Sequence, residues 1–542
     1  MKKIITLIGF FILLFQFQNS YCQDYLETAT AQGSGITTDN SRVWTDLVSV
    51  TIDVTNISNV LLTASINMRP DGVHTGGREG NYNIYRSDLV TDNSGGIERQ
   101  MIANTDGTGV ESWGIGTLVH IFDTSTLSGN VTYILEHSNK GVTDSGRNVF
   151  SSATLTAVAL TTEINNFELS NDVKRLDTEE ITTSEDYEIV RGLTSSLVSL
   201  ASEGDFYVAA SINSRSDGSD TTGEYKLEFS VDAGGSWSDL GKPVRRSMGN
   251  NFDEGIISLV GLLQDNKGIH SNYQFRISHR RVSGFNTIIT SNVNLVVVAL
   301  THSNGYFPTF YSEVSTPGVD ISGVSTPSAL VTSSDFTSVA DIDGVGTGLF
   351  VHAQYRVSAD GLNESTPQRM RSSNQLFLDQ GITYQEPSQE YFRYISNNSS
   401  FGSGGFIGLA EDLDSEATYT VSMFHKIDNI YAPDGIEDEV LSTSEVVLAG
   451  FQTYDFNTLV LTNDDIKTED KIKIFGALGK IEIRSTEPIN AEIKIYNILG
   501  KLISSSRINN QSDTSIDLGN FKGIAIVSII TEGRIITKKV II

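Results

Sequence analysis

One unit of about 140 residues occurs three times in this chain, and this repetition constrains the fold more than any other feature. The segment ASINMRPDG at 64–72 recurs as ASINSRSDG at 210–218, and AQYRVSADG at 353–361 is a third, more divergent copy. Each copy continues to a run that ends in histidine and then to a closing apolar run. The repetition predicts three successive domains, at residues 23–162, 163–302 and 303–453, followed by a linker at 454–471.

The pattern within each copy is all-β. Apolar and polar residues alternate over short runs, Gly, Asn, Asp and Ser separate the runs, and no stretch shows a sustained helical period. Such a copy suits a two-sheet β-sandwich, and its wide loops favour a jelly roll. The general pattern resembles tumour-necrosis-factor-like jelly rolls, although no motif specific to that family is present.

The N-terminus predicts a secretory signal peptide at residues 1–22. Lys2 and Lys3 precede an apolar run at 4–17, and Ser20 and Cys22 are the small residues before a cleavage site at Gln23. The alternative makes Cys22 the lipid-anchored first residue of a lipoprotein. No later segment offers about 20 consecutive apolar residues, the length that a membrane-spanning helix needs.

The charge of −28 is unevenly distributed. Residues 457–542 hold 12 basic and 10 acidic residues, a net of +2. Residues 23–456 hold 24 basic and 56 acidic residues, a net of −32. Lys2 and Lys3 supply the remaining +2 of the total. This change marks a domain boundary, and the acidity excludes an open nucleic-acid binder, which needs clustered Lys and Arg. A single Cys excludes both an internal disulfide and a thiolate metal site.

The last residues, 472–542, alternate as short strands and predict a small immunoglobulin-like β-sandwich. They contain EIKIYNILGKLI at 492–503, IDL at 516–518, GIAIV at 523–527 and TKKVII at 537–542. These motifs, in this order, resemble the type IX secretion C-terminal sorting domain of Bacteroidota. Two positions depart from the family: Ala525 replaces the usual aromatic residue, and the usual Asn-Pro pair is absent near Lys473.

The resemblance implies export across the inner membrane and recognition of the tail by the outer-membrane translocon. It also implies removal of the tail, then release of the protein or attachment to surface lipopolysaccharide. The protein would therefore be secreted or held at the outer cell surface. The family's motif corresponds here to Tyr496, Gly500, Lys501, Gly523, Lys538 and Lys539.

Three histidines recur at one position of the repeat: His137, His279 and His425. Strand periodicity places them on the apolar side. One interpretation is a repeated ligand or metal contact, and the other is a buried histidine that completes each core through a backbone hydrogen bond.

Two acidic loops are weak candidates for a metal site. One loop contains Asp217 and Asp220, and the other contains Asp341 and Asp343, in each case beside a Gly. Such oxygen-rich loops can chelate Ca²⁺. Turn chemistry alone also explains them. No other cofactor is expected.

Other patterns suggest binding or catalysis weakly. Tyr391 and Arg393 could form a sugar platform, because aromatic rings stack on sugars and Arg reaches hydroxyls. Glu224 and Glu228 are paired carboxylates on one strand face, which we interpret as a solvated sheet surface. The run SVDAGGSW at 230–237 resembles an Asp-box, which we interpret as a structural hairpin.

Taken together, the sequence predicts an exported, non-enzymatic adhesin, or a glycan-binding or structural protein that acts as a stalk. Triplicated domains multiply weak contacts with an extracellular glycan or protein ligand, whereas a catalytic site gains little from triplication. The alternatives are a polysaccharide-acting enzyme (a glycosidase or lyase) with a cleft in one repeat, and a passive surface-layer or matrix component.

Overall fold

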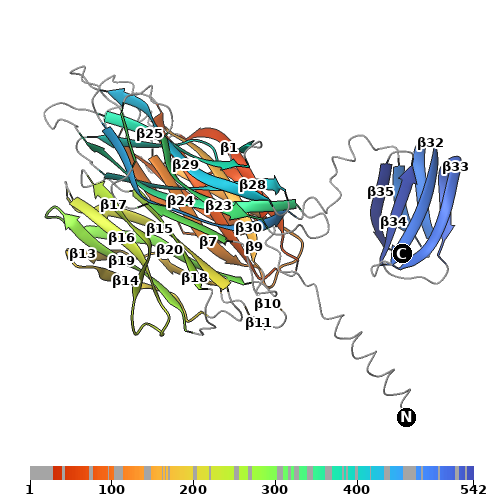
Figure 1. Cartoon of the computed structure of the whole chain (residues 1–542), viewed down its shortest axis with the longest axis horizontal. Helices are drawn as coiled ribbons and strands as arrows, with labels where there is room; N and C mark the ends of the chain where they lie inside the picture. Colours follow the sequence, from red (N-terminus) through yellow and green to blue (C-terminus); the bar gives the residue numbers. More distant parts are fainter. Residues whose placement is uncertain are drawn as a thin grey trace, which may run out of the picture. The chain divides into compact units, whose positions relative to one another are not determined.

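The computed structural model consists of β-strands in two compact units, with no helix among the described residues (Figure 1). Strands β1 to β30 form the first unit, which we call the body, and β31 to β35 form the C-terminal unit. The all-β prediction is confirmed, and within the described residues no helix could span a membrane. The structure describes residues 28–38, 43–55, 57–71, 77–95, 97–102, 114–139, 148–160, 163–164, 167–168, 171–198, 204–218, 221–248, 255–265, 272–301, 309–314, 319–322, 329–338, 346–360, 369–380, 384–385, 388–396, 401–414, 417–431, 440–455, 472–477, 480–497, 501–518, 524–531 and 534–541.

The first of three jelly rolls has an inner sheet with the order β1-β9-β3-β7 and an outer sheet with the order β2-β8-β4-β5, where β6 also pairs with β4. The alternation of these nine strands between two antiparallel sheets is that of a jelly roll in which β5 and β6 both pair with β4. Its strands are β1 (Thr28–Thr38), β2 (Thr45–Asp53), β3 (Asn59–Asp71), β4 (Gly77–Arg86), β5 (Leu89–Asn93), β6 (Ile97–Ile102), β7 (Gly114–Asp123), β8 (Asn130–Asn139) and β9 (Asn148–Leu160).

The second jelly roll repeats this plan. Its inner sheet is β12-β20-β15-β18, with β13 also on β20, and its outer sheet is β14-β19-β16-β17. The strands are β12 (Asp172–Leu176), β13 (Glu180–Thr182), β14 (Glu188–Thr194), β15 (Gly204–Ser216), β16 (Thr221–Ser230), β17 (Ser238–Met248), β18 (Gly255–Asp265), β19 (Gln274–Ser283) and β20 (Ile288–Thr301). A short hairpin, β10 (Glu163–Ile164) with β11 (Phe167–Glu168), precedes it.

The third jelly roll has the inner sheet β21-β30-β24-β28, with β22 also on β30, and the outer sheet β23-β29-β25-β26, with β27 also on β25. Its strands are β21 (Thr309–Val314), β22 (Val319–Ser322), β23 (Ala329–Thr337), β24 (Gly346–Asp360), β25 (Arg369–Asp379), β26 (Tyr384–Gln385), β27 (Tyr391–Ser396), β28 (Phe401–Leu413), β29 (Thr418–Tyr431) and β30 (Val440–Asp455).

The inner sheets are buried on both faces. On β3, the alternate residues Val60, Leu62 and Ala64 pack between the two sheets of their own jelly roll. The intervening Leu61 faces the other way, into an apolar core shared by all three jelly rolls. That shared core contains Leu61, Val119, Ile121, Val158, Leu160, Tyr207, Ala209, Val260, Leu262, Val296, Val298, Leu300, Phe350, Ile407, Val447, Ala449 and Phe451. The three jelly rolls therefore form one body around a common core, not a stalk of separate modules.

Hydrogen bonds close the three jelly rolls into a ring. Three equivalent residues, on strands β3, β15 and β24, each accept a backbone N–H from an edge strand of a neighbouring jelly roll. The bonds are Ile407 N–H to Ser65 Oγ (2.7 Å), Val119 N–H to Ser211 Oγ (3.5 Å) and Val260 N–H to Gln354 Oε1 (2.7 Å). The inner-sheet edges β7, β18 and β28 are thus covered, which removes the pairing hazard of an open edge.

The three edge strands meet at equivalent residues. Thr117, Ser258 and Gly405 pair with the three accepting residues just described, one on each of β7, β18 and β28. A Cβ atom on Gly405 would overlap the side chain of Ser258 and lie 3.1 Å from Thr117 Oγ1. All three jelly rolls therefore touch at this point, which only a glycine leaves open.

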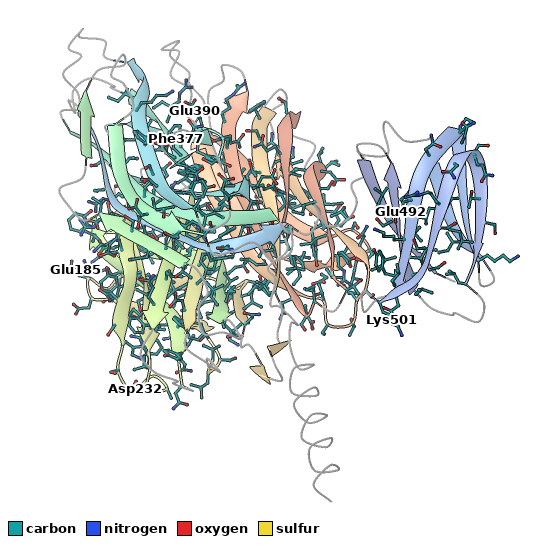
Figure 2. All side chains as sticks on the ribbon, turned by 45° about the vertical axis from the view of Figure 1, so that its right-hand side comes forward. Glu185, Asp232, Phe377, Glu390, Glu492 and Lys501 are labelled. Carbon is teal, nitrogen blue, oxygen red and sulfur yellow. The ribbon has the colours of Figure 1, made fainter. Side chains whose placement is uncertain are left out.

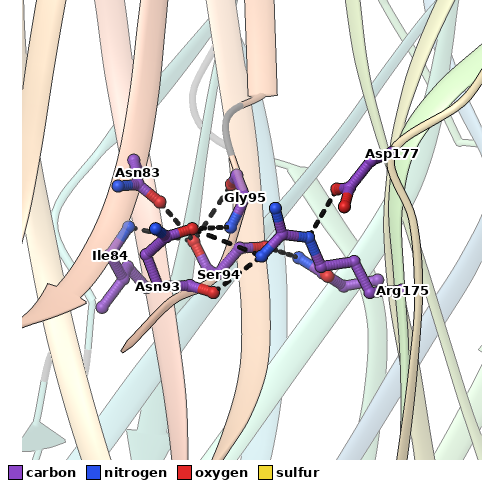
Figure 3. Close-up of polar contacts among 8 residues, drawn as sticks. Asn83, Ile84, Asn93, Ser94, Gly95, Arg175 and Asp177 are labelled. Atoms are coloured by element: carbon purple, nitrogen blue, oxygen red, sulfur yellow. Dashed lines mark hydrogen bonds and ion pairs between the residues drawn. The ribbon is translucent and has the colours of Figure 1, made fainter. Parts of the chain in front are cut away.

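Polar contacts also join the jelly rolls, as Figure 3 shows for the first and second. Arg175 donates from Nη1 to the carbonyl oxygen of Asn93 (2.9 Å), and Asn294 donates from Nδ2 to that of Ser94 (2.9 Å). Gly95 has φ +76°, and a Cβ there would lie 2.7 Å from Arg175 Nε. Asparagine and glutamine side chains make similar bonds at the other two junctions: Gln354 to the Lys242 carbonyl (2.8 Å) and Asn67 to the Glu390 carbonyl (2.9 Å).

The Ser65→Ala variant tests the ring. It would leave the buried N–H of Ile407 without its acceptor, so we expect a loss of about 1–3 kcal/mol in the free energy of unfolding. Urea denaturation of the full chain measures this, with Ser49→Ala on the exposed face of β2 as the matched control. Equal midpoints for the two variants would contradict the role given to Ser65.

The C-terminal unit is a five-stranded antiparallel sheet around its own apolar core. Its strands are β31 (Ile472–Ala477), β32 (Lys480–Asn497), β33 (Leu502–Asp517), β34 (Ile524–Thr531) and β35 (Arg534–Ile541). Along one side β32 pairs with β33, and along the other it pairs first with β31 and then with β34. Alternate residues of β32, such as Ile493 and Ile495, fill the core.

Candidate ligand-binding face

The three recurring histidines are buried inside their jelly rolls. His279 Nδ1 hydrogen-bonds to Thr290 Oγ1 at 2.9 Å, and His425 Nδ1 bonds in the same way to Thr443 Oγ1. Neither ring nitrogen of His137 has a hydrogen-bond partner. Burial lowers the pKa of His137 and of His279 to about 4. His137 and His279 therefore lie in the interior as neutral groups, and His279 and His425 each bond to a threonine hydroxyl, where a backbone atom was predicted.

Of the four aspartates in the two candidate metal loops, the structure describes only Asp217. Asp217 is exposed, and its Oδ1 accepts the backbone N–H of Thr287 (2.7 Å), as a turn residue does. Asp220, Asp341 and Asp343 lie outside the described residues. Among the residues that are described, no three His, Cys, Asp or Glu side chains gather closely enough to hold a metal ion.

Tyr391 does not offer an exposed ring for a sugar. It is fully buried, stacks on Phe406 with 5.0 Å between ring centroids, and donates from its hydroxyl to Thr154 Oγ1 (3.4 Å). It thus anchors the third jelly roll against the first. Arg393 is part of β27, but its side chain lies outside the described part of the structure.

Glu224 and Glu228, on the outer sheet of the second jelly roll, are buried in ion pairs instead of solvated. Glu224 is 2% exposed and accepts from Tyr187 Oη (2.6 Å), Arg280 and Arg245. Glu228 pairs in the same way with Lys226 (2.9 Å) and Arg276 (2.7 Å). Burial raises the pKa of both carboxyls, but these hydrogen bonds outweigh burial and hold the pKa below the usual value. Two such permanently ionised, fully paired carboxylates cannot serve as a general acid.

This ion-pair network stabilises the second outer sheet. The Glu224→Gln variant would leave Arg245 and Arg280 without their buried counter-charge, and we expect a loss of about 3 kcal/mol. Thermal unfolding of the full chain measures it, and Glu185→Gln, at a largely exposed carboxylate on the same jelly roll (Figure 2), is the control. A Glu224→Gln protein as stable as the control would show that the network contributes nothing.

The Asp-box-like run forms a closed hairpin between β16 and β17, with Asp232 at its turn (Figure 2). Asp232 accepts from Ser230 Oγ (2.6 Å), from Ser236 N (2.8 Å) and from Ser236 Oγ (2.8 Å). These bonds lower the pKa of Asp232 to about 2. Trp237 packs back by donating to the carbonyl of Gly234 (3.1 Å). The polar side chains of Ser230, Asp232, Ser236 and Trp237 bond within the turn, so the role of the run is structural.

The outer sheet of the first jelly roll presents a different surface. Asp46, Glu136 and Asn83 lie in one row across β2, β8 and β4, because each is directly paired with the next. Asn83 donates from Nδ2 to Glu136 Oε1 (2.9 Å), and Tyr85 donates from its hydroxyl to Asp46 Oδ1 (3.1 Å). Two like charges directly opposite each other destabilise a sheet, so a row of this kind needs a reason other than folding.

No lysine or arginine among the described residues forms an ion pair with Asp46 or Glu136. Burial and the charge of Asp46 raise the pKa of Glu136, although its bond with Asn83 acts in the opposite direction. Burial and the two carboxylates raise the pKa of Tyr85 to about 12. The row is therefore an acidic surface whose negative potential is not neutralised by any described residue of the protein.

An exposed indole lies at the start of the same sheet. Trp44, which is 43% exposed, directly precedes β2. Tyr187 has the same place before β14 in the second jelly roll, and its ring lies 4.2 Å from Lys226 Nζ and 4.5 Å from Arg280 Cζ, over the outer sheet. Trp44 thus extends the row of polar groups with an aromatic ring. We call Trp44, Asp46, Asn83, Tyr85 and Glu136 the first outer face.

The equivalent rows of the other two jelly rolls lack these groups. In the second jelly roll the row consists of Ile189, Ser278 and Lys226. In the third jelly roll it consists of Leu330, Phe424 and Gln375. Phe424 packs edge-to-face with Phe377, the residue labelled in Figure 2, with 5.0 Å between ring centroids. Only the first row carries two carboxylates and an amide. The sequence analysis missed this site, although aligning the three copies strand by strand would have shown that one copy differs.

In the C-terminal unit, the structure places four of the six predicted motif residues. Tyr496 is half-buried on β32, Lys501 is exposed just before β33, and Lys538 and Lys539 belong to β35. Gly500 and Gly523 lie outside the described residues. Asn497, which was not among the predicted site residues, closes the turn: its Oδ1 accepts the Lys501 N–H (2.9 Å) and its own N–H donates to the Lys501 carbonyl (2.9 Å).

Comparisons with known proteins differ between the two units. No curated protein matches the chain. Among solved structures, the tandem CBM22-1–CBM22-2 domain of Xyn10C from Paenibacillus barcinonensis has 8% identity, covers 51% of this chain and 92% of its own, and has a TM-score of 0.15. The glycosylasparaginase PNGase F from Flavobacterium meningosepticum has 8% identity, covers 51% and 96%, and has a TM-score of 0.22. Scores this low establish no shared fold.

Residues 477–542 match the family described as the secretion system C-terminal sorting domain. The match covers the strands in which the sequence motifs were found, including β32 with Tyr496 and β35 with Lys538 and Lys539. Such a domain implies an interaction with the type IX secretion machinery. The C-terminal unit is therefore a type IX secretion sorting domain, and the protein that carries it is exported and is either secreted or attached to the outer cell surface.

Proposed function

We propose that the protein is a non-catalytic glycan-binding protein of the cell surface or its surroundings, and that it binds through the first outer face. The observation that carries this proposal is the row of Asp46, Glu136 and Asn83 beside Tyr85 and the exposed Trp44. Aromatic rings stack on the apolar faces of sugars, and carboxylates and amides form hydrogen bonds with their hydroxyls. On the equivalent surface of the second jelly roll, the carboxylates form ion pairs with lysine and arginine side chains of the same sheet.

The shared core gives this face a rigid support. Beneath Asp46 and Glu136, the inward residues of β2 and β8 belong to the packed core of the first jelly roll, whose inner sheet is in turn held by the other two. Groups held on strands lose little conformational entropy when a ligand arrives. In this proposal, the second and third jelly rolls act as scaffold, and attachment to a glycan follows from one face.

A glycan array with the purified mature protein tests the proposal. We expect binding to a subset of glycans, and at least a tenfold weaker affinity for the Trp44→Ala variant. The control is Ile189→Ala, at an exposed apolar residue that begins the equivalent row in the second jelly roll. A wild-type protein that binds nothing on the array, or a Trp44→Ala variant that binds as well as the wild type, would overturn the proposal.

A polysaccharide-acting enzyme is the second candidate function, and one observation favours it. Glu136, with its raised pKa, lies directly across from Asp46, and a pair of neighbouring carboxylates, one of them with a raised pKa, is the equipment of a glycosidase. The release of reducing ends from any glycan bound on the array, abolished in Glu136→Gln, would support the enzyme. Binding without release supports the non-catalytic reading, and an absence of both supports a passive matrix component.

A further inference from the structure

We propose that the glycan recognised by the first outer face carries free amino groups, as de-N-acetylated glucosamine polymers do. This inference rests on the proposed function and specifies its ligand class.

On the outer sheet of the second jelly roll, both buried carboxylates have cationic partners supplied by the protein. Glu224 has Arg245 and Arg280, and Glu228 has Lys226 and Arg276. In the first jelly roll, the described residues supply Asp46 and Glu136 with a phenol and an amide, both neutral. Within the described part of the chain, the group that the first face lacks is a cation, and an ammonium group on the ligand would take the place that arginine and lysine take in the second jelly roll.

The aromatic groups of the face suit the same ligand. In the second jelly roll, the ring of Tyr187 is flanked by the cations of Lys226 and Arg280. Trp44 occupies the corresponding place, and tryptophan is the aromatic side chain that attracts cations most strongly. A sugar ring with an ammonium substituent can therefore stack on Trp44 while its charge interacts with the indole face and with the nearby carboxylates.

The charge of the whole chain disfavours acidic glycans, the opposite ligand class. The formal net charge is −28, so an acidic polysaccharide would approach against repulsion, which neither Asp46 nor Glu136 relieves. A neutral glycan would have only hydrogen bonds and stacking. It would leave the like-charged pair uncompensated, whereas an amino glycan compensates it. The expected order of affinity is thus amino, then neutral, then acidic.

Two probes with the same backbone test the inference: β-1,4-linked glucosamine hexamer, and the same hexamer fully N-acetylated. At low salt and pH 6, the full chain should bind the free-amine hexamer at least tenfold more tightly, measured by isothermal titration calorimetry. Raising the salt concentration should weaken binding of the amine form and leave that of the acetylated form nearly unchanged.

Variants assign this preference to the face. Glu136→Gln and Asp46→Asn should each bring the amine hexamer to within about threefold of the acetylated one, while Glu185→Gln, on the second jelly roll, should keep the full preference. Equal affinity of wild-type protein for the two hexamers, or an unchanged preference in Glu136→Gln, would overturn the inference. The proposed glycan-binding function would survive that result, because it fails on different outcomes: no glycan bound at all, or unchanged binding by the Trp44→Ala variant.

Discussion

Acidification from pH 7 to pH 4 is expected to unfold the body, because four buried histidines must stay neutral in the native state. Burial lowers the pKa of His120, His137 and His279 to about 4, and that of His352 to about 3. In the unfolded chain these groups titrate near the ordinary value of about 6.5. Between about pH 6.5 and pH 4 the unfolded state therefore binds more protons, and stability falls as the pH falls.

The expected loss of stability is large because four histidines contribute to it. A pKa lowered by about two units corresponds to about 3 kcal/mol of stability lost for each histidine by pH 4, against a total stability of about 5–15 kcal/mol for a typical protein. Burial raises the pKa of Glu136 and of Asp92, so these carboxyls bind protons in the native state and offset a small part of the loss. Urea denaturation at pH values from 7.5 to 4.5 measures the slope.

A variant of His352 tests whether the buried histidines cause this dependence of stability on pH. It lies between the second and third jelly rolls, with Tyr207 Oη 2.7 Å from Nδ1 and Ser258 Oγ 3.0 Å from Nε2. The His352→Gln variant keeps hydrogen-bonding capacity but cannot be protonated, so its stability should depend less on pH in this window. A wild-type stability that stays constant from pH 7 to pH 4.5 would contradict the account of the buried histidines.

The Gly405→Leu variant is expected to disrupt the body altogether. Gly405 lies where the three inner-sheet edges meet, and even a Cβ atom would overlap Ser258. Overpacking by a whole side chain at a point held from three sides should cost more than about 4 kcal/mol, because neither neighbouring strand can yield without breaking its own pairing. Size-exclusion chromatography and urea denaturation of the full chain would show an expanded or unstable body.

The matched control is Gly129→Leu. Gly129 has φ +83°, and a Cβ there would meet no atom within 4 Å. The strained backbone alone should cost about 1 kcal/mol, which separates the general effect of replacing a glycine from crowding at the centre. Equal stability of the Gly405→Leu and Gly129→Leu proteins would show that the jelly rolls do not meet as described.

Much of this fold can be predicted from sequence, because strand periodicity and repetition are local signals. Alternation over runs such as that of β3 predicts strands, and the turn chemistry of Asp217 with Thr287 agrees with its Asp-Gly pair. The sorting motif is also local: Tyr496, Asn497 and Lys501 belong to one hairpin. These features need no knowledge of distant contacts.

The packing of the three jelly rolls could not be predicted in the same way. The run LVVVAL at 295–300 is apolar at consecutive positions, as strands buried on both faces are, but periodicity does not say what covers the second face. The first outer face was missed for a related reason. Asp46, Asn83 and Glu136 are separated by long stretches of sequence and become neighbours only through pairing of β2, β8 and β4. Tyr391 was misjudged because its ring stacks on Phe406 and its hydroxyl bonds to Thr154 of a different repeat, contacts that strand periodicity does not reveal.

The most direct test of the central claim, that a glycan binds on the first outer face, is the fluorescence of Trp44. The chain has three tryptophans, so the Trp113→Phe/Trp237→Phe variant leaves Trp44 as the only reporter. With a glycan selected by the array present at saturation, quenching of Trp44 by acrylamide should fall at least twofold and its emission should shift to the blue. Unchanged quenching and emission, while calorimetry shows that the same variant binds the glycan, would contradict the account.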